Sequence, residues 1–221
     1  MSAHPAPAVA VDVALCTVRD GALHVLLVQA RHGPFAGWWA LPGGRVREEE
    51  SLDVAADREL LAQTGVTDPY LEQLYTFGSP YRDPHGRVVS VAYVGLVAST
   101  GPDARLSGPG KYDALAWRPV RRLPPLAYDH ADVVRTAVTR LRAKVHYTNL
   151  AYTLLPRAFT LGELQAVYEA ILARRLDRRN FRKKLLSLGL LRPLGRMRRG
   201  PHRPAALYAF RSRRPMTVAV L

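Results

Sequence analysis

The stretch from Asp177 to Gly189 constrains the fold of this chain most strongly, because it has the pattern of a short helix with one apolar face. Phe181, Leu185 and Leu188 recur at i, i+4 and i+7, which places them on the same side. Asp177 is a typical N-cap residue and Gly189 a typical helix stop. The other faces carry the cations, which are Arg178, Arg179, Arg182 and Lys183. The pattern predicts a cationic helix packed on a small core.

A second helix before this stretch and a hairpin after it complete a recognisable arrangement. The earlier helix opens with the capping box Thr160-x-x-Glu163 and has an apolar face over residues 164–171. Residues 190–210 are predicted to form a hairpin whose tip, residues 196–203, is almost entirely cations and turn formers. Helix, turn, cationic helix and cationic hairpin are typical of a winged helix-turn-helix that binds DNA.

The charge of the chain is concentrated in this C-terminal part. Residues 147–221 hold 16 Lys and Arg against 3 Asp and Glu, a balance of +13. Residues 1–146 hold 16 against 15, a balance of +1, and the two parts sum to the +14 of the whole chain. A basic helix could also lie on a membrane, but the apolar face of residues 178–188 has no Trp and only one aromatic residue. We therefore predict double-stranded DNA as the partner.

Ten residues are candidates for contacts with DNA, because they are polar or cationic and fall on the two helices or on the hairpin tip. They are Thr160, Arg178, Arg179, Asn180, Arg182, Lys183, Arg196, Arg198, Arg199 and Arg203. One small winged helix offers few base contacts, so we expect a homodimer on a pseudo-palindromic operator. Its interface is expected on apolar surface that includes the strand at residues 88–98 and the helix at residues 129–146.

The remaining composition excludes several classes of protein. The chain has no apolar run near the roughly 18 residues of a membrane span and no signal-peptide pattern at its start, so we expect a cytoplasmic location. Cys16 is the only cysteine, which rules out an internal disulfide, and it is expected to be a buried thiol. Three segments are predicted: a disordered arm at residues 1–8, an effector-binding domain at residues 9–146 and the DNA-binding domain at residues 147–221.

The first 146 residues have the pattern of an α/β domain. Alternating apolar residues predict strands at 9–19, 23–31, 71–78, 88–98 and 113–119. Ser51 is the expected N-cap of a helix that Gly65 ends, and a second helix is predicted from about residue 129 to 146. Residues 32–44 are predicted to be a loop, because they are rich in Gly and Pro.

Residues 44–66 resemble the Nudix box, G-x5-E-x7-R-E-U-x-E-E-x-G-U, in which U is apolar. Seven of its positions match in register, namely Gly44, Glu50, Arg58, Glu59, Leu60, Gly65 and Val66. The box performs metal-assisted attack on a diphosphate, and its helix stacks carboxylates that hold divalent cations. The resemblance implies an α/β (α+β) fold class: a Nudix α/β/α sandwich with a mixed sheet, followed by the winged helix-turn-helix.

The chain departs from this box where the family has two adjacent glutamates. Ala62 and Gln63 stand at these positions, so one has lost its ligand atom and the other its charge. Glu59 remains, while the resemblance assigns Glu50 to a structural pair with Arg58. One carboxylate is a poor cage for Mg²⁺. We therefore expect no catalytic residues, no metal site and no cofactor.

A degenerate Nudix domain fused to a basic winged helix is similar to the Nudix-related transcriptional regulators of bacterial NAD metabolism. The resemblance covers about residues 9–210 and includes the segments Tyr75-Thr76-Phe77-Gly78 and Asp177-x-Arg179-Asn180-Phe181-Arg182. It implies a homodimeric repressor of NAD biosynthesis or salvage genes, whose Nudix domain senses ADP-ribose or a related nucleotide and releases DNA on binding.

The effector site is expected to combine cations for a diphosphate, aromatic rings for a base, and glycines that allow close approach of the backbone. These candidates are Arg31, Trp38, Gly43, Gly44, Arg45, Glu59, Tyr81, Arg82 and Arg87. His32 and His85 are expected to be surface residues. Two alternatives stay open: a working ADP-ribose pyrophosphatase that also binds DNA, and the same regulator with a sugar or a sugar phosphate as its effector.

Overall fold

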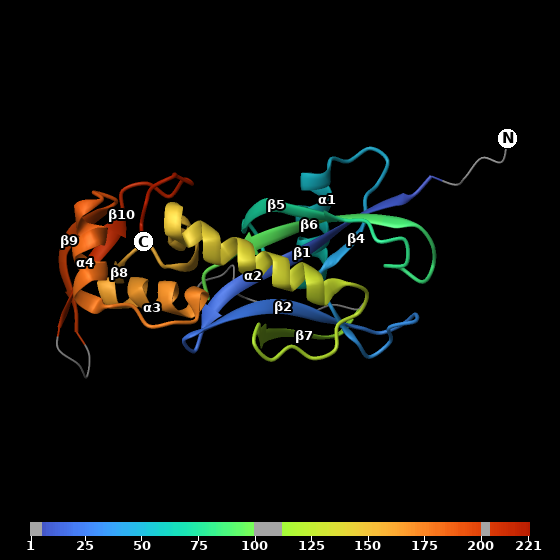
Figure 1. Ribbon diagram of the computed structural model, residues 1–221, viewed down its shortest axis with the longest axis horizontal. Helices are drawn as coiled ribbons and strands as arrows, with labels where there is room; N and C mark the ends of the chain where they lie inside the picture. Colours follow the sequence, from blue (N-terminus) through green and yellow to red (C-terminus); the bar gives the residue numbers. More distant parts are fainter. Residues whose placement is uncertain (1–5, 100–111, 200–203) are drawn as a thin grey trace.

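The computed structural model describes residues 6–99, 112–199 and 204–221. Its elements are β1 (Ala8–Arg19), β2 (Ala22–Ala30), β3 (Trp39–Ala40), β4 (Gly43–Arg45), α1 (Leu52–Thr64), β5 (Tyr70–Phe77), β6 (Val88–Leu96), β7 (Tyr112–Pro119), α2 (His130–Tyr147), the 3-10 helix η2 (Leu150–Leu154), β8 (Phe159–Thr160), α3 (Leu161–Leu172), α4 (Arg178–Ser187), β9 (Leu191–Arg198) and β10 (Ala205–Phe210). They form an elongated molecule with the larger sheet at one end and α3, α4 and β8–β10 at the other (Figure 1).

The larger sheet is mixed. Within the described chain its strand order is β3-β2-β1-β6-β5, with β4 paired to β1 and β7 paired to β2. β1 runs parallel to β6, from Ala8 opposite Val88 to Cys16 opposite Leu96, and antiparallel to β2 and β4. The parallel pair brings the start of β6 next to the start of β1, where the candidate site lies.

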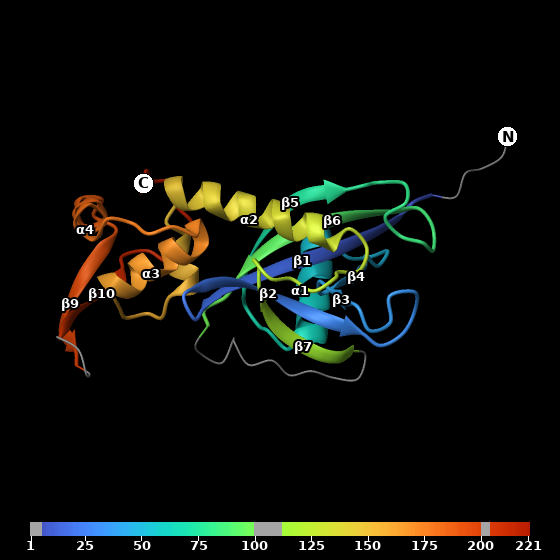
Figure 2. The same cartoon turned by 60° about the horizontal axis from the view of Figure 1, so that its bottom comes forward.

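Helices α1 and α2 cover opposite faces of this sheet (Figure 2). Side chains alternate along β1, so that Val11, Val13 and Leu15 belong to the buried cluster that includes α1 residues. Ala14 and Cys16 belong to the cluster that includes the buried face of α2. The layers are helix, sheet and helix, which confirms the expected α/β/α sandwich.

The ends of α1 are set by the expected capping residues. The Ser51 side chain accepts a hydrogen bond from the backbone N–H of Val54. Gly65 adopts a φ of 71°, the left-handed conformation that a glycine adopts without a steric penalty, and its N–H donates to the Leu61 carbonyl. Both helix boundaries are therefore local properties of the sequence.

Residues 32–44 are not wholly a loop, as was predicted, because they contain β3 and the start of β4. The two strands are two and three residues long, too short to show alternation, and they exist through pairing with β2 and β1. Gly43 is required there, since a Cβ atom would lie 2.3 Å from the carbonyl oxygen of Val11. The expected dimer surface also needs correction, because β6 lies between β1 and β5 and is buried along almost its whole length.

The C-terminal part is a winged helix. Its small sheet has the order β8-β10-β9, and α3 and α4 pack against it. Thr160 and Glu163 form both hydrogen bonds of the predicted capping box, and Asp177 caps α4 by accepting from the N–H of Asn180. Phe181 and Leu185 are the buried residues of α4, as the i, i+4 spacing predicted.

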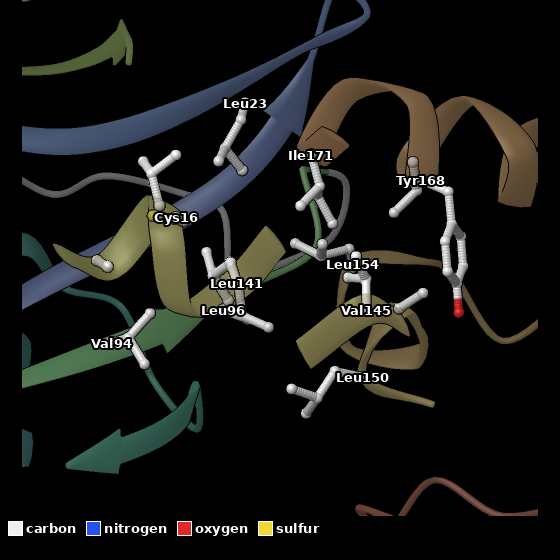
Figure 3. Close-up of a cluster of buried hydrophobic side chains, with 14 of the residues drawn as sticks. Cys16, Leu23, Val94, Leu96, Leu141, Val145, Leu150, Leu154, Tyr168 and Ile171 are labelled. Carbon is white, nitrogen blue, oxygen red and sulfur yellow. The ribbon is translucent and has the colours of Figure 1, made fainter. Parts of the chain in front are cut away.

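One hydrophobic core crosses from the larger sheet into the winged helix. Leu141 and Val145 of α2 share a buried cluster with Leu154, Tyr168 and Ile171. Figure 3 shows these side chains together, where α2, α3 and the strand that carries Leu23 meet. The two parts are therefore joined by apolar packing as well as by the chain between α2 and β8.

The residues after β10 return to the C-terminal end of α2. The backbone N–H of Val218 donates to the Tyr147 carbonyl at 2.8 Å, and that of Val220 donates to the His146 carbonyl at 2.8 Å. These bonds satisfy carbonyls that the last turn of a helix leaves without a partner. None of the described helices combines the length and apolarity needed to cross a lipid bilayer.

Candidate effector cavity and nucleic-acid interface

A cavity of about 430 Å³ opens beside the first residues of β1, at the glycine-rich turn that precedes α1. Side chains and backbone from β1, the β2–β3 and β3–β4 connections, the loop before β6, β7 and the start of α2 surround it. The lining is Ala10, Asp12, Ala30, Arg31, His32, Ala40, Leu41, Gly43, Gly44, Arg45, Arg82, Asp83, His85, Val88, Tyr112, Tyr128 and His130. Five predicted effector residues are among them: Arg31, Gly43, Gly44, Arg45 and Arg82.

The floor of the cavity is a buried charge network centred on Arg82. Its guanidinium donates to Asp129 at 2.7 and 3.0 Å and to Asp12 at 3.0 Å. Ser90 donates a further hydrogen bond to Asp12 at 2.5 Å. Burial raises the pKa of Asp12, but its interactions with His130, Ser90 and Arg82 outweigh this effect and hold the pKa below its ordinary value. Asp12 is therefore ionised at neutral pH.

His130, the first residue of α2, is held in one tautomer by two neighbours. Its Nδ1 accepts the backbone N–H of Leu41 at 2.9 Å, so this nitrogen carries no proton. The proton is on Nε2, which lies 3.3 Å from Asp12. At the floor of the cavity one guanidinium, that of Arg82, therefore faces two carboxylates, Asp12 and Asp129.

The predicted cations occupy different environments around the cavity. Arg31 pairs with Asp113 at 2.7 Å. Arg87 lies outside the lining and donates to the carbonyls of Gly78 and Ser79. Arg45 is exposed at the rim, and its guanidinium has no hydrogen-bond or ion-pair partner within the described chain.

Several aromatic side chains line an adjoining cavity of about 610 Å³. Tyr81 lies there and is 93% exposed, whereas Trp38 lines neither cavity and packs its ring 5.9 Å from that of Phe35. Tyr128 and Arg82 line both cavities. The Tyr128 ring lies between Phe35, at 4.5 Å, and His130, at 5.2 Å.

On the other side of the Gly43 strand, Gln63 stands where the Nudix box has the second of its adjacent glutamates, and it bonds to the residues around it. Its amide nitrogen donates to the Gly43 carbonyl at 2.7 Å and to Glu59 at 2.5 Å, while its oxygen accepts the Gly43 N–H at 3.1 Å. Glu59 also pairs with Arg58 at 2.5 Å, and a Cβ on Gly44 would lie 2.4 Å from the Glu59 carboxylate. The carboxylate is thus bonded to a half-buried arginine and to a buried amide.

These residues do not fit the divalent cation that the Nudix box implies. Ala62 is exposed and supplies no ligand atom, and the amide nitrogen of Gln63 is a donor directed at the oxygens that a cation would need. The second box carboxylate, Glu50, accepts two hydrogen bonds from Arg58, at 2.5 and 2.8 Å. Within the described residues there is no group of three or more His, Cys, Asp or Glu side chains suited to a metal ion.

The opposite end of the molecule carries the cationic surface. The predicted DNA contacts on α4 are all exposed, namely Arg178, Arg179, Asn180, Arg182 and Lys183. Arg196, Arg198 and Arg199 are exposed at the end of β9, and Arg203 lies outside the described residues. A groove of about 490 Å³ separates α3 and α4 from the wing and is lined by Thr160, Arg178, Arg182 and Met197, among others.

Two of the predicted DNA contacts are already engaged within the protein. The Thr160 hydroxyl accepts the Glu163 N–H and lies 3.1 Å from the Glu163 carboxylate, so its capacity is used by the helix cap. Arg198 pairs with Glu163 and donates to the Ala158 carbonyl, which ties the wing to the start of α3. Among the described residues, the exposed cations of α4 have no such internal partner.

Sequence reasoning did not find Asp12, Tyr128 or His130. Asp12 could have been noticed, since a lone carboxylate within an apolar strand needs a buried partner. Tyr128 and His130 gave no local signal, because their position depends on how α2 meets the sheet. His32 and His85 line the cavity, and both are exposed.

Comparisons with known proteins match both parts of the chain. The NUDIX domain model matches residues 7–137, and the model of the NrtR DNA-binding winged helix domain matches residues 151–210. The ADPR responsive transcriptional repressor NtrR of Acinetobacter baylyi is 36% identical over 211 residues, which are 95% of this chain and 84% of the relative.

Two solved structures are similar to this one. The crystal structure of Shewanella oneidensis NrtR complexed with a 27mer DNA has a TM-score of 0.81 at 36% identity, covering 92% of this chain and 93% of that chain. The NUDIX domain of the same protein, complexed with ADP ribose, has a TM-score of 0.58 at 37% identity, covering 63% of this chain and 91% of that chain. The NUDIX match spans more than half of the chain, and the bacterial repressor aligns over most of both sequences. The chain therefore belongs to the NUDIX family, among the Nudix-related transcriptional regulators that carry an NrtR-type winged helix.

Proposed function

We propose that this chain is a transcriptional repressor that binds operator DNA through α4 and the wing, and releases it when ADP-ribose or a related nucleotide enters the 430 Å³ cavity. The observation that carries the proposal is the exposed cationic face of α4. This helix belongs to the winged helix in residues 147–221, which have a net charge of +13. Support comes from the relatives, of which one is described as ADPR responsive and another was crystallised with DNA.

The organisation that we propose follows the sequence. Residues 9–146 bind the effector and residues 147–221 bind DNA, whereas the predicted arm at residues 1–8 falls mostly outside the described residues and its last residue, Ala8, already belongs to β1. The protein acts as a homodimer on a pseudo-palindrome, and its targets, by resemblance, are NAD biosynthesis or salvage genes. Because β6 lies in the interior of the sheet, the dimer interface must involve other elements. The edge strand β5, which exposes Tyr75, is one candidate.

The charge distribution of the cavity orients the proposed ligand. At its floor the Arg82 guanidinium is already paired with two carboxylates and is not free for a phosphate, but carboxylates and an imidazole are good partners for ribose hydroxyls. The diphosphate is then placed at the rim, beside the unpaired guanidinium of Arg45 and the backbone of Gly43 and Gly44. Tyr128 and the adjoining aromatic cavity offer a surface on which a base can stack.

In this proposal the effector is bound and not consumed. A Nudix hydrolase needs carboxylates around a divalent cation. Here Glu59 is the box carboxylate on this face of α1, and Gln63 and Arg58 donate hydrogen bonds to it. The alternative of a working ADP-ribose pyrophosphatase requires Mg²⁺-dependent turnover by the unmodified chain. Steady-state assays of AMP release from ADP-ribose, with Mg²⁺ or Mn²⁺, separate the two functions.

The proposal is tested with duplex DNA obtained by in vitro selection against the purified chain. Duplexes are selected from a random pool by binding to the purified chain, and the enriched duplex is used in gel-shift titrations. ADP-ribose, other nucleotides, sugars and sugar phosphates are then compared as competitors of DNA binding. The proposal predicts that ADP-ribose or a close relative releases the duplex, whereas release by a sugar phosphate alone would support the alternative effector.

A further inference from the structure

The C-terminal end of α3 is held by two arginines that belong to the effector-binding part. The Nε of Arg142, on α2, donates to the Ile171 carbonyl at 3.1 Å. A terminal nitrogen of Arg121, two residues after β7, donates to the Ala173 carbonyl at 3.1 Å. The last carbonyls of a helix lack partners within the helix and carry partial negative charge, so two guanidinium groups stabilise this end.

Helices α3 and α4 are linked so that the orientation of one sets that of the other. Glu169 of α3 accepts the backbone N–H of Leu176 at 2.9 Å, and Gln165 donates to the Leu176 carbonyl at 3.0 Å. The rings of Tyr168 and Phe181 meet at 5.2 Å across the two helices. A rotation of α3 therefore carries the recognition helix α4 with it.

Helix α2 connects this pair of helices to the effector cavity. Asp129, immediately before α2, binds Arg82 at the cavity floor, and His130 lines the cavity. Arg142 lies 12 residues after His130, which corresponds to about 18 Å along a helix at ~1.5 Å per residue. Figure 1 shows α2 running along the long axis of the molecule from the large sheet to α3.

The joint between the two parts is packed on one side and open on the other. Leu141 and Val145 contact the cluster of Leu154 and Ile171 on the packed side (Figure 3). The other side contains a cavity of about 340 Å³, lined by the β1–β2 turn, residues 119–121, Arg142 and the last turns of α3. Close-packed interiors resist deformation, so the space at this joint is where α3 can pivot.

We infer that Arg121 and Arg142 are positioning residues for the recognition helix, and that α2 with these two arginines transmits occupancy of the effector cavity to α4. The transmission half of this inference rests on the proposed function. The arginines hold the end of α3, and neither lines the effector cavity. A ligand that engages Asp129 or His130 shifts α2 along its axis, and Arg142 carries the shift to α3.

The first test needs no ligand and uses the full chain. Amide hydrogen exchange is measured on the parent, Arg142→Ala, Arg121→Ala and the double variant. Residues 173–187 should exchange at least 10-fold faster in the double variant, while residues of α1 should be unchanged. The matched control is Arg135→Ala, which removes an exposed cation on α2 whose ion-pair partner in the described part of the chain is Asp132, on the same helix. Unchanged exchange at residues 173–187 would overturn the positioning role, and coincident thermal melts would confirm that the variants are folded.

The second test measures transmission as the ratio of DNA dissociation constants with and without saturating ADP-ribose. The parent and Arg135→Ala should show the same ratio, in the range of about 5–150-fold that is typical of allosteric coupling. Arg142→Ala should bind ADP-ribose within about 2-fold of the parent by calorimetry, but with a ratio that falls toward 1, and Arg142→Lys should restore part of it. A parent-like ratio in Arg142→Ala would overturn transmission through this contact. Failure of the parent to bind ADP-ribose would refute the proposed effector, while the exchange result would still decide the positioning role.

Discussion

Replacing Gln63 with glutamate should destabilise the protein and make its stability depend on divalent cations. The buried amide donates to the Gly43 carbonyl and to the Glu59 carboxylate. Glutamate at position 63 has no N–H donor, so both bonds are lost. Its carboxylate would also lie beside that of Glu59, because the amide nitrogen that it replaces is 2.5 Å from a Glu59 oxygen. Each lost bond that leaves a buried group unsatisfied costs about 1–3 kcal/mol, so the two lost bonds lower the free energy of unfolding by about 2–6 kcal/mol.

Thermal and urea denaturation measure this effect directly. In a chain of this size 1 kcal/mol corresponds to roughly 2–4 °C, so the melting temperature should fall by roughly 4–24 °C at pH 7. The loss should shrink in acid, because a proton shared between the two carboxylates removes their repulsion. Millimolar Mn²⁺ should also restore stability, since two carboxylates and a carbonyl form an oxygen site for a cation, and 100-fold excess over the dissociation constant contributes about 2.7 kcal/mol.

The matched control for this experiment is Leu61→Glu. It adds the same charge two residues earlier, at an exposed position of α1 that is not a ligand position of the Nudix box and where no buried bond is lost. Its effect should stay within about 0.5 kcal/mol of the parent, with or without Mn²⁺. If Gln63→Glu melts with the parent in the absence of metal, or ignores Mn²⁺ as Leu61→Glu does, then the amide does not have the role assigned to it here.

Four further outcomes are expected. Arg179→Ala combined with Arg182→Ala should abolish specific retardation of the selected duplex at matched salt, because an arginine reading guanine contributes ~1–3 kcal/mol; unchanged affinity would contradict the assignment of α4. Arg45→Ala should weaken ADP-ribose binding at least 10-fold in calorimetry and leave DNA affinity unchanged, whereas an equal loss of both would indicate a structural defect. Hydrogen bonds from Arg58 lower the pKa of Glu50 to about 2. The pair therefore stabilises the fold above the unfolded pKa of about 4.3, and this stabilisation is lost as the pH falls toward 2. The difference in melting temperature between the parent and Glu50→Gln should shrink over that interval, and a constant difference would refute the assignment. Light scattering at micromolar concentration should report a dimer, and a monomer alone would contradict the two-fold operator model.

Local sequence signals predicted the helices well, because capping residues act within a few positions of the ends that they define. Ser51 and Gly65 bound α1, and Thr160 and Asp177 begin α3 and α4, as expected. The long strands followed from alternation. Strands β3 and β4 could not be predicted in this way, since pairs of two or three residues depend on partners far away in sequence.

The candidate site was predicted less completely than the fold, for a physical reason that Arg82 illustrates. The sequence identifies a loop cation suited to a phosphate, but the structure places this guanidinium on two carboxylates, Asp12 and Asp129. One of them comes from the middle of an apolar strand and the other from the cap of α2. Such a network exists only after three distant segments meet, so no local pattern reveals it.

The most direct measurement for the central claim is the affinity of the full chain for its selected duplex as ADP-ribose is added, followed by fluorescence anisotropy at fixed salt without added metal. The account predicts that the dissociation constant rises about 5–150-fold to a plateau, and that DNA weakens ADP-ribose binding by the same factor, as linkage requires. A dissociation constant that stays constant while calorimetry shows bound ADP-ribose would contradict it.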